Sequence, residues 1–270
     1  MVVIILTITL CVVLSLGRIN NDSRYDGRSA AAWLVLSSDT SAKIRMTAAA
    51  ALDYLWPVAR SLQPRIAQAE VHLLDDSDAG VRAEATAAVA GMATESPDIV
   101  PAIVTVLTQS PRLESRVQAA HALGAVGPAA RSAVPALIRA AAALESPLRV
   151  AAIAALDDGG ASRDSAVITA LVRATADDDE NVRGVAIDAL GRAPVELGVL
   201  VPLAVRALRD PAVGVREEAA YVLSESSDTS RTALAALTEA ASDSDATVRR
   251  LAAHALARRR SRAKQGENGG

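Results

Sequence analysis

Arginine recurs along this chain at intervals of 33 to 37 residues. Three residues after each of these arginines stands an alanine, and seven residues after each stands leucine or valine. Such self-similarity indicates a stack of short repeats, because each repeat buries its apolar face only against its neighbours. The arginines that set the register are Arg45, Arg82, Arg116, Arg149, Arg183, Arg216 and Arg249.

The residues around each arginine have the spacing of one face of an α-helix. The positions one before, three after and seven after the arginine are spaced i, i+4, i+8. In one repeat these residues are Val182, Ala186 and Leu190. We expect this face to be buried, with the alanine where a neighbouring helix comes too close for a larger side chain.

A second helix is expected before each of these. It is clearest at 100–104, 134–138 and 201–205, where proline in the second position either starts the regular part of the helix or bends it. In the turn between the two helices, aspartate often stands six residues before the arginine, where a carboxylate suits the free N–H groups of the coming helix. These aspartates are Asp39, Asp76, Asp177, Asp210 and Asp243.

The pattern Asp-x5-Val-Arg-x2-Ala-x2-Ala-Leu resembles HEAT repeats, in particular the short type also found in phycobiliprotein lyases. The junction at 122–128 and the segment 133–138 look like that family's boundary between units. The resemblance covers roughly residues 29–260, in seven units. It implies an all-α, right-handed α-solenoid of about seven helix pairs. It also implies an Arg–Asp ladder between neighbouring units and a concave face lined by the second helices.

The composition agrees with a helical stack and restricts its function. Hydrophobic residues make up 51% of the chain, whereas aromatic residues make up 2%, so small side chains must fill the core between closely packed helices. The net charge of −3 argues against nucleic-acid binding by bulk charge. The single cysteine, Cys11, excludes an internal disulfide framework and a multi-cysteine metal site.

The first residues form a separate segment, Met1–Gly17, without a charged side chain. As a helix it would be roughly 25 Å long, just short of the hydrocarbon core of a membrane. We predict a single-pass membrane anchor, with the solenoid in the cytoplasm because arginines follow the segment. A cleaved secretory signal, which would make the protein secreted or periplasmic, and a buried core helix are the alternatives. Residues 18–28 are predicted as a linker and residues 261–270 as a disordered basic or polar tail.

The second helix of each repeat should expose the positions one, two and five residues after the arginine. These positions vary between repeats while the buried positions stay constant, so they are candidates for binding a partner, although ordinary solvated surface is the alternative. The predicted partner-binding residues are Glu84, Gln118, His121, Asp188, Glu217, Glu218, Tyr221 and His254.

No catalytic, cofactor or metal site is predicted. The sequence has no P-loop or Ser/His/Asp set, and no two histidines are close in register. A basic cluster, Arg258, Arg259, Arg260, Arg262 and Lys264, suits the end of the last helix or an anionic lipid surface.

We therefore predict a non-catalytic, membrane-anchored scaffold that binds another protein on its concave face. Neither nucleic acid nor a small-molecule substrate is expected as a partner. The alternative is a lyase-like or lyase-accessory protein acting on a protein that carries a prosthetic group.

Overall fold

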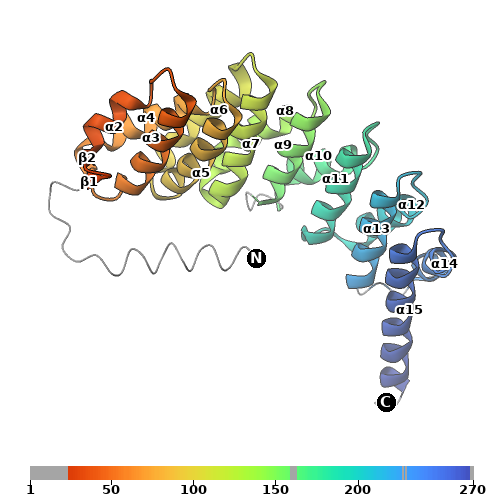
Figure 1. The fold of residues 1–270 in the computed structure, drawn as a ribbon. Coiled ribbons are helices and arrows are strands. Elements are labelled where there is room, and N and C mark those ends of the chain that lie inside the picture. Colours follow the sequence, from red (N-terminus) through yellow and green to blue (C-terminus); the bar gives the residue numbers. More distant parts are fainter. Residues whose placement is uncertain (1–23, 159–162, 227, 229, 268–270) are drawn as a thin grey trace. The chain divides into compact units, whose positions relative to one another are not determined.

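The computed structural model describes residues 24–158, 163–226, 228 and 230–267. In these residues the helices fall into seven consecutive pairs, as the arginine register predicts (Figure 1). The pairs are α2 (Ala30–Leu36) with α3 (Ala42–Leu55), α4 (Gln63–Leu73) with α5 (Ala79–Glu95), α6 (Val100–Gln109) with α7 (Leu113–Val126), α8 (Val134–Ala140) with α9 (Ser146–Asp158), α10 (Ser165–Ala174) with α11 (Glu180–Arg192), α12 (Leu197–Ala207) with α13 (Val213–Glu225), and α14 (Arg231–Ala240) with α15 (Ala246–Glu267).

Short 3-10 helices precede three of the first helices, and the prolines have two different roles. The 3-10 helices are η1 (Arg60–Leu62), η2 (Pro97–Ile99) and η3 (Gly127–Ala133). Pro101 and Pro135 occupy the first turn of α6 and α8, where the N–H group that proline lacks would have no partner within the helix. Pro202 instead lies inside α12.

The chain divides into two compact units, Met1–Ala88 and Val89–Gly270. In the second unit the second helices α7, α9, α11, α13 and α15 pack successively against one another and form one layer. The first helices pack against the second helix of their own pair, and contacts between α6 and α8, α8 and α10, and α12 and α14 build the other layer. This two-layer stack is a helical solenoid.

The predicted helix face is buried. All seven alanines three positions after the arginine are fully inaccessible to solvent, as are six of the seven residues four positions further on. The exceptions on this face are Ile44, which is 37% exposed, and Leu256, which is half-buried. They belong to the first and last pairs of the described chain, which have a neighbouring pair on one side only.

The repeat arginines form ion pairs between neighbouring repeats, which confirms the predicted ladder. Nε and Nη2 of Arg149 donate to the two carboxylate oxygens of Asp177 in the next repeat, at 2.9 and 2.7 Å. Its Nη1 donates to the carbonyls of Ala143 and Leu144 in the turn of its own repeat. Each such arginine therefore ties its own turn to the next one. The same two-oxygen pairing joins Arg45 to Asp76, Arg183 to Asp210 and Arg216 to Asp243.

The ladder changes where the sequence lacks the turn aspartate. The fourth repeat has Ala143 at that position, and Arg116 pairs instead with Glu145, two residues further along the turn, at 2.9 Å. The third repeat has Ser110, and Arg82 makes no ion pair with any described residue. It keeps only the two carbonyl hydrogen bonds of its own turn.

The prediction that this aspartate caps the following helix is wrong. Asp177 accepts the N–H of Asp179, the residue before the first residue of α11, and so closes the turn rather than capping the helix. Asp179 is the N-cap of α11, and its carboxylate accepts the N–H groups of Asn181 and Val182. The turn aspartate therefore faces the arginine of the preceding repeat, while the residue two positions later caps the helix. Asp78 and Asp245 are equivalent capping residues.

Removing a ladder arginine should destabilise the second unit. Arg183→Ala leaves the largely buried carboxylate of Asp210 without its cation, so we expect a loss of about 2 kcal/mol and a melting temperature lower by roughly 4–8 °C. Thermal unfolding followed by far-UV circular dichroism measures this shift. Arg209→Ala is the control, because the pair of Arg209 with Glu239 is 65% and 62% exposed and should contribute little. Equal shifts in both variants would contradict a stabilising ladder.

Part of the predicted linker, residues 18–28, is structured. Strands β1 (Arg24–Tyr25) and β2 (Arg28–Ser29) pair in an antiparallel hairpin. Asp26 and Gly27 at its tip have φ of 48° and 74°, as a type I′ turn requires, and Asp-Gly favours this turn.

The hairpin is held against the first helix pair by aromatic side chains. The indole N–H of Trp33 donates to the carbonyl of Tyr25 at 3.0 Å. The Tyr25 ring contacts those of Trp33 and Tyr54, with centroids 6.0 and 5.4 Å away, and the guanidinium of Arg28 lies over Trp33. These contacts make residues 24–29 part of the first unit.

The structure describes the predicted segment at only one end of the chain. The predicted hydrophobic helix, residues 1–17, lies outside the described residues. Within the described residues, none of the helices has the length and hydrophobicity needed to span a bilayer. At the other end, α15 continues to Glu267 and so includes most of the residues predicted as a tail, because arginine, alanine, lysine and glutamine favour helix.

The first unit buries one acidic side chain in its core. Glu70 of α4 is fully inaccessible to solvent, and neither of its carboxylate oxygens has a hydrogen-bond partner in the described structure. Burial, with the negative charges of Asp53 and Glu84, raises the pKa of Glu70 to about 8. The side chain is therefore mostly neutral at pH 7.

Candidate functional site

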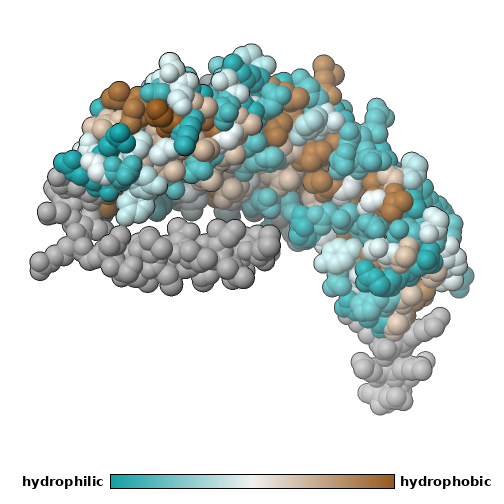
Figure 2. Space-filling model, in the orientation of Figure 1, coloured by the Kyte–Doolittle hydropathy of each residue, from teal (hydrophilic) through white to brown (hydrophobic). Residues whose placement is uncertain are grey.

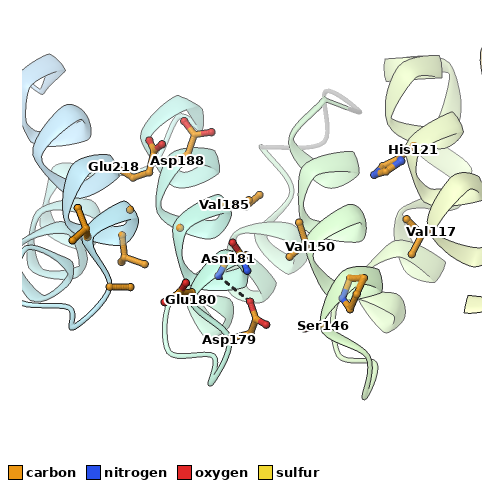
Figure 3. A pocket seen from close by; sticks show the side chains of 16 residues that line it. Val117, His121, Ser146, Val150, Asp179, Glu180, Asn181, Val185, Asp188 and Glu218 are labelled. Atoms are coloured by element: carbon orange, nitrogen blue, oxygen red, sulfur yellow. Dashed lines mark hydrogen bonds between the residues drawn. The ribbon is translucent and has the colours of Figure 1, made fainter. Parts of the chain in front are cut away.

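Four successive second helices of the second unit line a groove. Residues of α7, α9, α11 and α13 surround a volume of about 780 Å³ (Figure 3). Val117, Val150 and Val185, one each from α7, α9 and α11, are half-buried in its lining. Val213, at the start of α13, is 42% exposed. The groove therefore presents an apolar surface that is only partly covered by the chain itself.

The polar part of the lining is acidic. Its carboxylates are those of Asp179, Glu180, Asp188 and Glu218, and the described lining residues include no lysine or arginine. Figure 3 shows Asp179 and Glu180 at the start of α11, and Asp188 near Glu218 further along these helices. The groove can thus accept hydrogen bonds from cations while burying apolar side chains.

Two of the four carboxylates already have partners. Asp179 caps α11. Asp188 pairs with Arg192 at 2.8 Å, and the same guanidinium binds the largely buried Asp157 of α9 at 2.6 Å. Arg192 of α11 therefore links its own helix to α9 and is shared between two acids.

Glu180 and Glu218 make no ion pair with any described residue. Burial raises the pKa of Glu218, and the negative charge of Asp188 raises it further, although Arg192 opposes this effect. Glu180 is exposed at the start of α11. These two carboxylates are the ones available to an external cation.

All eight predicted partner-binding residues are exposed or half-buried, but the groove brings only three of them together. His121, Asp188 and Glu218 line it. The remaining five residues lie outside the groove lining. They are Gln118 on α7, Glu217 and Tyr221 on α13, His254 on α15, and Glu84 on α5 in the first unit.

Sequence reasoning missed most of the apolar lining. Val117 and Val150 stand one position after their arginines, a position that was expected to be exposed. The residues predicted to bind a partner were polar, charged or aromatic instead. Valine at a position expected to be exposed was the sequence signal that could have identified this apolar lining. Asp179 and Glu180 were not among the predicted partner-binding residues.

Outside the groove, exposed apolar residues on the face seen in Figure 2 are interrupted by hydrophilic ones. Leu144, in the turn between α8 and α9, is 95% exposed. No group of three or more potential metal ligands occurs among residues 24–158, 163–226, 228 and 230–267.

Comparison with solved structures finds similar helical stacks. The chain matches YibA of E. coli with a TM-score of 0.58 at 20% identity, covering 85% of this chain and 81% of that one. It matches Kap95p, in a structure that describes Kap95p binding to RanGDP, with a TM-score of 0.64 at 15% identity, covering 84% of this chain and 36% of that one. It matches Cex1p with a TM-score of 0.58 at 15% identity, covering 89% and 54%. These identities show a shared fold only.

The chain thus spans about a third of Kap95p and about half of Cex1p. Among curated protein sequences, none matches it. A family model described as HEAT repeats matches residues 168–257, which include α11, α13 and the groove residues they carry. The family match thus identifies HEAT repeats at residues 168–257, and the seven helix pairs of the described residues form a solenoid with the fold of these solved structures.

Proposed function

We propose that this protein is a non-catalytic scaffold that binds a partner protein in the groove of α7, α9, α11 and α13. The observation that carries the proposal is the lining of this groove. Half-buried valines of α7, α9 and α11 lie in it beside two carboxylates, Glu180 and Glu218, that make no ion pair with any described residue. An apolar centre with a polar surround is the usual composition of a protein interface.

The solenoid fold supports the proposal in a more general way. Stacked repeats form long surfaces on which many weak contacts add up. Kap95p, whose fold is similar, binds the protein RanGDP according to the description of its structure. A likeness of fold does not transfer that partner to this chain.

The proposal keeps the N-terminal segment, residues 1–17, as a membrane anchor that fixes the scaffold at a bilayer. The anchor rests on the uncharged sequence of that segment. Two arginines of the C-terminal basic cluster have other partners than lipid. Arg258 pairs with Glu225, and the buried Arg259 donates to the carbonyls of Leu223, Ala255 and Asp228.

Site-specific photo-crosslinking tests the scaffold directly. The full-length chain would carry p-benzoylphenylalanine at Val150 or Val185 in the groove, or at Thr105, which is exposed on α6 of the other layer. In the source cells we expect a discrete protein adduct from the two groove positions and none from Thr105. Adducts from Thr105 alone, or identical adducts from all three positions, would contradict groove binding.

The lyase-like alternative stays a prediction from the repeat sequence. The same purified chain and its adduct can be checked for visible absorbance. A chromophore that passes from this chain to the partner protein would indicate a transfer function in place of the scaffold.

A further inference from the structure

We propose that the occupant of the groove is a lysine- or arginine-rich segment of the partner protein that carries apolar side chains at intervals of about 10 Å. This inference rests on the proposed function, since it specifies the chemistry of the partner. It follows from the charge, the apolar lining and the spacing of the groove.

The charge of the lining favours a cationic segment. Among the residues that the structure describes, four carboxylates and no lysine or arginine line the groove. Asp188 already shares Arg192 with Asp157, whereas Glu180 and Glu218 have no ion pair within the described residues. An acidic segment would face these carboxylates, and Arg192, the cation nearby, is already shared between two acids, so the loss of hydration would be poorly compensated.

The apolar lining sets where side chains of the segment would be buried. Val117, Val150 and Val185 lie on three successive helices of the layer. Helices packed in this way are about 8–10 Å apart, so the valines recur at about that spacing. A bound helix rises 1.5 Å per residue, and its residues seven positions apart lie about 10 Å apart on one face. A helix with an apolar residue at every seventh position and basic residues beside it therefore fits both features.

His121 and the two paired acids do not change this preference. His121 is an exposed member of the lining on α7. The carboxylate of Asp179 stays engaged with the first turn of α11. The preference therefore depends on Glu180 and Glu218, which can be altered without removing a cap or a ladder pair.

A peptide-binding experiment tests the inference. The probe is a labelled synthetic helical peptide of roughly 21 residues, with leucine at every seventh position, lysine beside each leucine and alanine elsewhere. Fluorescence anisotropy would measure its binding to the full-length chain in nonionic detergent. We expect saturable binding that weakens as salt is raised, and no binding of the same peptide with glutamate in place of lysine.

Protein variants locate the binding. Glu180→Lys with Glu218→Lys should weaken the lysine peptide about tenfold or more, because like charges then face one another. Glu114→Lys with Asp98→Asn is the control outside the groove and should leave the affinity unchanged. Circular dichroism checks that each variant remains helical. A second variant, Glu180→Gln with Glu218→Gln, should weaken binding with less disturbance of the fold.

Two results would overturn the inference. One is lysine-peptide binding that survives both groove variants, and the other is equal binding of the glutamate peptide. The proposed function fails differently, through the absence of adducts from Val150 and Val185. Groove adducts with a partner segment that lacks basic residues would therefore sustain the scaffold and remove the charge preference.

Discussion

Replacing Glu70 by glutamine should abolish a loss of stability that we expect the first unit to show between about pH 4.5 and pH 8. The native Glu70 side chain is buried without a hydrogen-bond partner, and its pKa is raised from 4.5 to about 8, chiefly by burial. In the unfolded chain the same carboxyl ionises near its ordinary pKa. Between these two values unfolding releases a proton, so the free energy of unfolding falls as the pH rises.

The size of this effect is on the order of 5 kcal/mol, since each unit of pKa difference corresponds to about 1.4 kcal/mol. Part of this shift comes from the groups that face Glu70, because Asp53 and Glu84 are both negative. The ladder acts in another pH range. Burial would raise the pKa of Asp76, but the hydrogen bond from Arg45 and the N–H of Asp78 hold it below its usual value, so its contribution is lost only as the pH falls below about 4.

Tryptophan fluorescence can follow the first unit selectively. The chain has two tryptophans, Trp33 and Trp56, and both are buried in the first unit. Urea unfolding at pH 5 and pH 8 should give a clearly lower midpoint at pH 8 for the natural chain and equal midpoints for Glu70→Gln. Glu114→Gln, on the exposed face of α7, should keep the natural difference. Equal midpoints for the natural chain would show that Glu70 is ionised or solvated.

The sequence predicted the repeat structure because its signals are local. Alanine between two apolar residues at helical spacing predicts a buried helix face, and Ala186 and its six equivalents are buried. The Arg–Asp ladder was predictable through the family resemblance, because both residues recur in the same register. The pairing of Arg116 with Glu145 was not predicted, because Glu145 stands two positions away from the repeated aspartate and only the folded turn places it near the arginine.

The features that the sequence did not predict depend on tertiary neighbours. The hairpin at residues 24–29 is too short for periodicity and is held by Trp33 and Tyr54. The burial of Glu70 and Arg259 contradicts the ordinary preference of charged residues for the surface. The valines of the groove share positions with polar residues of other repeats, so only the packing of successive helices showed that three of them line one groove.

The second large effect is expected at Gly191, where α11 and α13 approach closely. A Cβ atom at this position would lie 2.5 Å from Cγ2 of Val222 and 3.2 Å from its Cγ1. Val222 is 4% exposed, and its branched side chain has little rotameric freedom in a helix. Gly191→Ala should therefore force α11 and α13 apart and cost about 1–3 kcal/mol.

The matched control is Gly91→Ala in α5, since a Cβ atom there meets nothing within 4 Å. That substitution should raise stability by up to about 1 kcal/mol, because alanine favours helix more than glycine does. Thermal unfolding of the two variants should consequently shift in opposite directions. The double change Gly191→Ala with Val222→Ala should show a smaller penalty for the alanine than in the natural background, because the opposing methyl groups are gone.

Equal shifts for Gly191→Ala and Gly91→Ala would mean that α11 and α13 can separate at little cost. The expected difference has a further consequence for the candidate site, because α11 and α13 carry Asp188 and Glu218 on facing positions of the groove. The close approach at Gly191 sets the spacing between these two helices, and with it the spacing at which the groove can meet a partner.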